Sequence, residues 1–219
     1  MITSTRTATA IDPAAPGLLT LVQWLSPAFP TGAFACSHGL ETAIADGRLA
    51  DADAVEHWVA DLLRHGSGWQ DALLLAAGLA PDADLDALSG LARALATSAE
   101  RLTETCDQGA AFALTLGQHP PRPLPLALAQ AARPLGVPVP VVVALYLNSF
   151  ATNLVTIATR AVPLGQTRAQ AILAALRPLV QSLADRAAAA SLDDLASSCF
   201  AADLAAMAHE TLQPRLFRT

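Results

Sequence analysis

The hydrophobic positions of this chain recur at helical spacing in almost every segment. In segments such as Leu18–Leu25 and residues 53–66, apolar residues lie three and four positions apart, which is typical of an amphipathic helix. Similar segments follow as far as residue 212, and the alanine that dominates them favours helix. The pattern therefore predicts an all-α fold, a single-domain bundle of about eight to ten helices.

Local signals place several helix ends. Asp53 and Glu56 have the spacing of a capping box, so we expect a helix to open there and to end at Gly66. The next helix should stop before Pro81, because proline cannot continue a helix. The stretch 85–117 is long enough for two helices or one bent helix, and the proline-rich stretch 119–125 is interpreted as an internal loop.

One uncharged stretch, between Arg133 and Arg160, is long enough to cross a bilayer. Polar side chains recur along it at spacings of three and four, and such a stripe would need partners inside lipid. We therefore predict the long, central, buried helix of the bundle, with Pro140 near its first turn. The alternative, a strand over 137–145, is disfavoured by its prolines. The stripe consists of Asn148, Thr152, Thr156 and Thr159, with Asn153 beside it.

Composition narrows the class of protein. The 219 residues carry a formal net charge of −6, and every basic residue is an arginine, so no basic surface for nucleic acid is expected. No membrane partner is expected either. Three separated cysteines, Cys36, Cys106 and Cys199, suggest reduced thiols in the cytoplasm. Residues 1–16 are predicted to be a disordered extension, and residues 17–213 to be the folded domain.

A short stretch near the N-terminus, residues 29–41, which we call the corner, holds the densest candidate chemistry. Cys36, His38 and Glu41 could form a metal site or a Cys/His nucleophile centre. One turn offers two or three ligands, fewer than the three or four converging ligands that a tight metal site requires. The alternative interpretation is a protein-binding surface, on which Cys36 and His38 are incidental.

In that second interpretation the corner is shaped by turn chemistry. Pro30 and Gly32 set a turn, and Phe34 is presented as an apolar anchor. Ser37 is expected to cap a helix opening at His38, with Glu41 in its first turn, where the helix dipole favours an anion.

The chain ends in a second candidate, residues 214–219, which we call the tail. After a helix that should stop at Pro214, "RLFRT" places Leu216 and Phe217 between two arginines. The stretch is either a frayed end or a docking segment whose apolar pair fills a pocket on a partner. As a docking segment it would contribute little to the stability of its own domain.

Four stretches, in this order, resemble the urease accessory protein UreF family: "SPAFPTGAFACSHGLETAIADG", "CDQGAAFA", "NLVTIATRAVPLGQ" and "MAHETLQPRLFRT". The resemblance implies an all-α, usually dimeric cytoplasmic chaperone that is not an enzyme. It implies binding to a UreD (UreH)-type partner, recruitment of the UreG-type GTPase, and nickel delivery to apo-urease. No cofactor is then expected to be tightly bound, and nickel is handled by the assembled complex.

The same resemblance assigns residues to partner binding. Phe34 stands where the family often has tyrosine, so any hydrogen bond from that hydroxyl is absent here. The family gives Cys36 and His38 no metal role. The matching positions are Gly39, Leu40 and Glu41 in the corner, and His209, Glu210, Arg215, Leu216, Phe217 and Arg218 at the C-terminus.

Three functional hypotheses follow. The first is a urease maturation scaffold that binds partners through the corner and the tail. The second is a Cys/His-dependent hydrolase or metal enzyme centred on Cys36 and His38, and the third is a helical interaction domain with an unrelated partner.

Overall fold

The all-α prediction is confirmed. The computed structural model describes residues 16–219, and these form ten α-helices, three 3₁₀ turns and no strand. The predicted disordered extension lies almost entirely outside the described residues. The α-helices are α1 (Pro16–Trp24), α2 (Leu40–Ala45), α3 (Ala52–His65), α4 (Ser67–Gly78), α5 (Leu85–Ala94), α6 (Ala99–Leu116), α7 (Leu124–Ala132), α8 (Val139–Ala161), α9 (Gln166–Ala189) and α10 (Phe200–His209). The 3₁₀ turns are η1 (Ala33–Ala35), η2 (Arg133–Leu135) and η3 (Leu192–Asp194).

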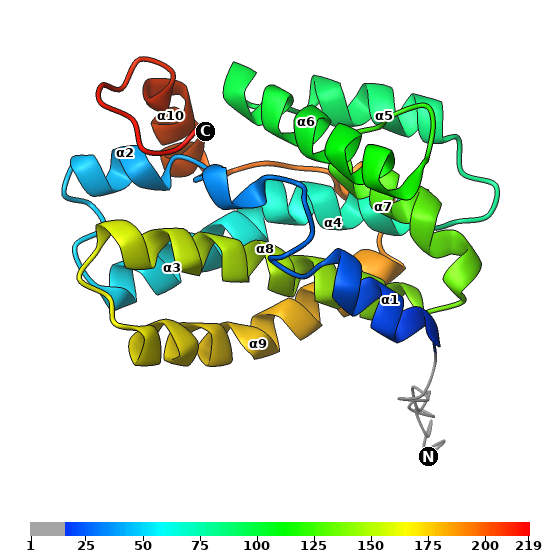
Figure 1. Cartoon of the computed structure of the whole chain (residues 1–219), viewed down its shortest axis with the longest axis horizontal. Coiled ribbons are helices and arrows are strands. Elements are labelled where there is room, and N and C mark those ends of the chain that lie inside the picture. The colour runs from blue at the N-terminus through cyan, green and yellow to red at the C-terminus, as the bar shows by residue number, and fades with distance from the viewer. Residues whose placement is uncertain (1–15) are drawn as a thin grey trace.

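The predicted central helix is α8, which packs against α9, α4, α3, α2 and α1 (Figure 1). It is long and apolar enough to span a membrane, yet half of its most apolar window, 50%, is buried inside the bundle. The prediction of a long, central, buried helix is therefore confirmed, with the burial concentrated on one face. Asn148 and Thr156 in its polar stripe are exposed. The hydroxyl groups of Thr152 and Thr156 donate to carbonyl oxygens one turn earlier, which satisfies them within the helix.

Two helix boundaries differ in detail from the sequence-based expectation. The N-cap of α3 is Asp51, whose Oδ1 accepts a hydrogen bond from the Ala54 amide at 2.9 Å, so the capping box predicted at Asp53 was wrong. The stretch 85–117 forms two helices rather than one bent helix. Ser98 separates them, because its hydroxyl caps α6 through the Arg101 amide.

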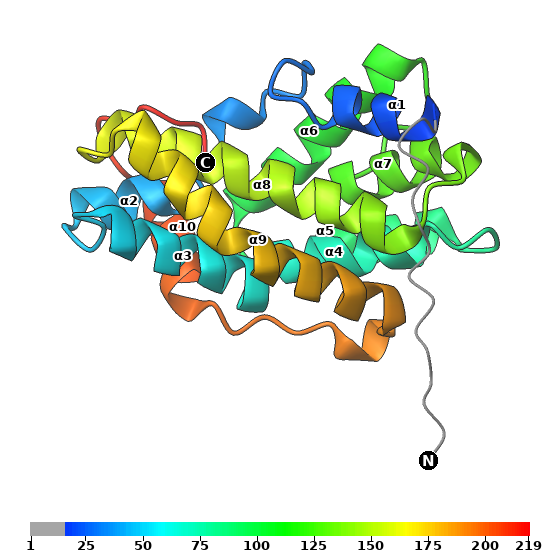
Figure 2. The same cartoon turned by 90° about the horizontal axis from the view of Figure 1, so that it is seen from below.

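An extended segment between α9 and α10 brings the C-terminus back to the N-terminal corner. Figure 2 shows this segment running along α3 and α4. The indole nitrogen of Trp69 donates to the Asp194 carbonyl at 3.1 Å, and the Ser198 amide donates to the His65 carbonyl at 2.9 Å. As a result, α10 packs on α2 and α6, and the tail lies beside the corner (Figure 1).

A pair of helical glycines tests this packing. A methyl group at Gly109 of α6 would overlap the carbonyl oxygen of Arg122, whereas nothing lies within 4 Å of a methyl group at Gly90 of α5. We expect Gly109→Ala to lower the free energy of unfolding by about 2–4 kcal/mol through overpacking. Gly90→Ala, the matched control, should raise it by about 0.5–1 kcal/mol. Urea unfolding followed by circular dichroism measures both, and equal effects would contradict the close α6 packing.

Candidate functional site

The corner and the tail, the two stretches singled out in the sequence, lie against each other. The Arg218 amide donates to the Ala35 carbonyl at 2.7 Å, and the Ser37 amide donates to the Thr219 carbonyl at 2.6 Å. These two hydrogen bonds pair the backbones of segments that are far apart in the chain. The tail is therefore packed on its own domain. This placement does not fit the expectation that the tail contributes little to the stability of the domain.

Glu41 is the residue that joins the two stretches. Its buried carboxylate accepts hydrogen bonds from the amides of Leu216 at 2.7 Å and Phe217 at 3.0 Å. The same carboxylate lies 2.9 Å from Nε2 of His209. Burial by itself raises the pKa of Glu41, but the hydrogen bonds from His209 and the two tail amides outweigh burial and lower it. A charged Glu41 thus holds the tail in place.

His209 lies between two carboxylates. Its side chain is 0% exposed, with Nε2 facing Glu41 and Nδ1 lying 2.7 Å from Glu100. Ionised carboxylates only accept hydrogen bonds, so both contacts are satisfied when each ring nitrogen carries a proton. Arg215 completes the chain of charges, with Nη1 2.7 Å from Glu100. His209 and Arg215, predicted as partner contacts, are engaged in these internal ion pairs.

A second buried carboxylate, Glu104, was not predicted from the sequence. One oxygen lies 2.8 Å from Nε2 of His38 and 3.1 Å from Arg101, and accepts a hydrogen bond from Gln108 at 3.2 Å. The other accepts the Thr219 hydroxyl at 3.0 Å. Burial raises the pKa of Glu104, but His38 and Arg101 outweigh burial and bring it down to about 2.

This arrangement corrects the role expected for His38. The residue was interpreted as incidental, but it is buried, and its other ring nitrogen lies 3.2 Å from the Ser67 hydroxyl. The only signal in the sequence was the spacing of Arg101, Glu104 and Gln108, which puts them on one face of α6. That spacing says nothing about a partner sixty-odd residues earlier in the chain, so the network could not be read from it.

The backbone of the corner explains why the sequence folds this way locally. Gly32 has a left-handed conformation with φ of 77°, and His38 and Gly39 follow with φ of 52° and 74°. A methyl group at Gly39 would lie 2.7 Å from the Ala206 amide of α10, so this glycine permits α10 to pack on the corner. Helix α2 begins at Leu40 rather than at His38, and Ser37 contributes a long hydrogen bond of 3.4 Å to the Glu41 amide.

The surroundings of Cys36 oppose the nucleophile hypothesis. Burial, followed by the nearby charge of Glu104, raises the pKa of Cys36 to about 11, which disfavours the reactive thiolate. The ring of His38 contacts Glu104 and Ser67, not the thiol. Among residues 16–219, no group of three or more His, Cys, Asp and Glu side chains is placed to hold a metal ion. The expectation that no metal is tightly bound stays a prediction.

Several large side chains remain exposed around the joined stretches. Phe34 on η1 is 62% exposed and Leu216 in the tail is 76% exposed, and Pro30, Glu210 and Arg218 also face solvent. On α10 the exposed apolar residues Phe200, Leu204 and Met207 share one helix face by their spacing. We call Phe34, Leu216 and these three α10 residues the apolar end surface. Gly39, Leu40 and Phe217, in contrast, are buried and shape this end from within.

Comparison with known proteins identifies the family. The UreF family model matches residues 49–177. A urease accessory protein UreF of Cereibacter sphaeroides (strain ATCC 17025 / ATH 2.4.3) is 60% identical over 207 residues, covering 92% of this chain and 98% of the relative. The chain belongs to the UreF family.

More distant members of the family match over a similar length. Urease accessory protein UreF of Roseobacter denitrificans is 50% identical, covering 92% of this chain and 93% of the relative. The protein of the same name from Mesorhizobium japonicum is 42% identical, covering 95% of this chain and 99% of the relative. The region matched by the family model lies between the corner and the tail, so it supports the bundle that holds these two stretches together. Family membership supports a urease accessory role.

The lowered pKa of Glu104 predicts how stability depends on pH. Its pKa falls from 4.5 to about 2 on folding, so its contribution is complete above pH 4.5 and is lost as pH falls towards 2. Glu104→Gln should lower the free energy of unfolding at neutral pH by about 3–5 kcal/mol and flatten the acid loss in that window. Urea unfolding at a series of pH values measures this. The exposed Asp82→Asn is the control, and an unchanged acid slope in Glu104→Gln would contradict the assignment.

Removing residues 215–219 tests whether the tail is structural. The truncation leaves Glu41 and Glu100 without tail donors and removes the Thr219 contact to Glu104, so we expect the melting temperature to fall by roughly 5–15 °C. Leu216→Ala, which keeps every backbone donor, should leave it nearly unchanged. Scanning calorimetry of the two variants gives the comparison. Equal melting temperatures for the truncated and full-length chains would show that the tail is peripheral.

Proposed function

We propose that this chain is a scaffold in urease maturation that binds a UreD (UreH)-type partner through the apolar end surface. The observation that carries the proposal is the joining of the corner and the tail by Glu41, which presents Phe34 and Leu216 on a structured support. Exposed aromatic and apolar side chains held by a rigid backbone are typical of protein-binding sites.

The buried charges determine which side chains of this surface remain free to contact the partner. Glu41, Glu100 and Glu104 bind the tail on its inner side. Arg215 and Phe217 therefore fix the path of the tail and do not contact the partner. The side chains left to a partner are Phe34, Leu216 and the exposed face of α10, and the charged Arg218 and Glu210 are exposed as well. An apolar centre with charged residues around it is the arrangement in which affinity comes from the centre and specificity from the rim.

The further steps of the proposal rest on family membership. Through its UreD-type partner the chain recruits and modulates the UreG-type GTPase for nickel insertion into apo-urease, in the cytoplasm and as a homodimer. Its contribution is to hold partners in register, and nickel is handled by the assembled complex. The buried Cys36 thiol with its raised pKa favours this role over the Cys/His enzyme.

Co-purification with the UreD-type partner tests the surface. Leu216→Asp and Met207→Asp each place a charge on an exposed apolar position, and we expect each to reduce capture about tenfold or more because an unpaired carboxylate must be desolvated. Leu114→Asp is the matched control, since Leu114 is 76% exposed on α6 outside this surface. Each variant is first checked for an unchanged melting temperature. Normal capture by both surface variants, or equal loss in Leu114→Asp, would contradict the proposal.

A further inference from the structure

A cavity of about 340 Å³ lies between the 26–34 segment, α6 and α8, and it shares only Phe34 with the apolar end surface. Its volume is within the range of small-molecule sites. The exposed residues Pro27, Phe34, Thr156 and Arg160 belong to its lining and mark its mouth, whereas Asp71 and Glu104 are buried at its floor.

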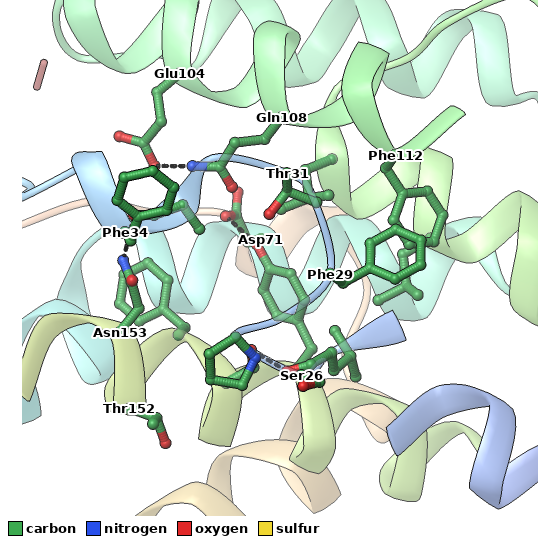
Figure 3. A pocket seen from close by; sticks show the side chains of 18 of the residues that line it. Ser26, Phe29, Thr31, Phe34, Asp71, Glu104, Gln108, Phe112, Thr152 and Asn153 are labelled. Carbon is green, nitrogen blue, oxygen red and sulfur yellow. Dashed lines mark hydrogen bonds between the residues drawn. The ribbon is translucent and has the colours of Figure 1, made fainter. Parts of the chain in front are cut away.

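Aromatic rings form much of the wall. The lining includes the chain's single tyrosine, Tyr146, and four of its six phenylalanines. Phe29 and Phe112 lie side by side, with centroids 5.3 Å apart (Figure 3). Trp24 meets Phe112 edge-on, with centroids 5.8 Å apart. Walls of this kind attract flat or positively charged groups, because the face of an aromatic ring carries partial negative charge.

Six polar side chains of the lining donate hydrogen bonds to acceptors of the protein. The hydroxyl groups of Ser149, Thr152 and Thr156 donate to the carbonyl oxygens of Leu25, Asn148 and Thr152. The amide nitrogen of Asn153 donates to Ala33, that of Gln108 to Glu104, and the Tyr146 hydroxyl to Asp71. Each of these six side chains therefore uses a donor on the protein, and their oxygen lone pairs are left for a ligand.

Asp71 supplies the strongest acceptor. It is 5% exposed, and its Oδ2 accepts hydrogen bonds from Arg101 and Tyr146, both at 2.6 Å. Its other oxygen, Oδ1, accepts no hydrogen bond from the described residues. Oδ1 is not among the fully buried polar atoms that lack a partner, so it is accessible and offers an acceptor to a ligand that carries donors.

The charged groups at the floor pair with one another. Asp71 and Glu104 face one guanidinium, that of Arg101. His38 also contacts Glu104 and the Ser67 hydroxyl. Arg160 opposes a cation only at the exposed mouth, where water and salt screen its charge.

From these observations we infer that the cavity binds a small organic cation, an alkylguanidinium or alkylammonium, with its charged end towards Asp71 and its alkyl chain along the aromatic wall. The inference is independent of the scaffold role, because it concerns the isolated chain and a surface that the partner test does not touch.

Calorimetric titration of the full chain with n-butylguanidinium tests the inference, and quenching of tryptophan fluorescence through Trp24 gives a second readout. Two ligands of similar size, the neutral n-butylurea and the anion n-pentanoate, report the dependence on charge. We expect the cation to bind about tenfold or more tightly than n-butylurea, and the anion not to bind.

Substitutions at the mouth locate the binding. Thr156→Trp should block entry and weaken n-butylguanidinium binding about tenfold or more, while Thr156→Val, which keeps the size of the side chain, should bind normally. Asn148→Trp places the same indole on the exposed face of α8 outside the cavity and is the matched control. Absence of cation binding, equal affinity for n-butylurea, or binding unaffected by Thr156→Trp would each overturn the inference.

Discussion

The rest of the structure at this end depends on the pairing of two buried carboxylates, Glu41 and Glu104, with donors that come from distant parts of the chain. A buried carboxylate is costly unless charged groups and hydrogen bonds compensate it. Glu41 finds compensation in His209 and the tail amides, and Glu104 finds it in His38, Arg101 and Thr219. The fold must therefore bring the tail and the corner together.

Helix α6 is the platform on which this pairing is built. Glu100, Arg101, Glu104 and Gln108 follow one another at helical spacing, so one face of α6 presents charges both to the tail and to the buried side of the corner. Close packing holds α6 in position, since Gly109 lies directly against the backbone of the loop that precedes α7. A shift of α6 would disturb both carboxylates at once. The packing of the bundle is therefore coupled to the apolar end surface.

The same network separates two kinds of surface. On the side of the tail it supports exposed apolar side chains, Phe34 and Leu216, and on the other side it forms the floor of a cavity lined by aromatic rings. Buried charges that are paired with one another fix the geometry of both sides. What each surface offers is then set by the groups left over, which are apolar side chains at the end of the molecule and oxygen lone pairs in the cavity.

The all-α class, the central position of α8 and the family could be predicted from the sequence alone, because helical periodicity and ordered motifs are local properties of the chain. The sequence also marked the corner and the tail as the stretches of interest. The packing of the helices brings these stretches together and buries His38 against Glu104. Which donor meets a carboxylate depends on how helices pack, and the spacing of residues along one helix does not encode a contact with a residue more than sixty positions away.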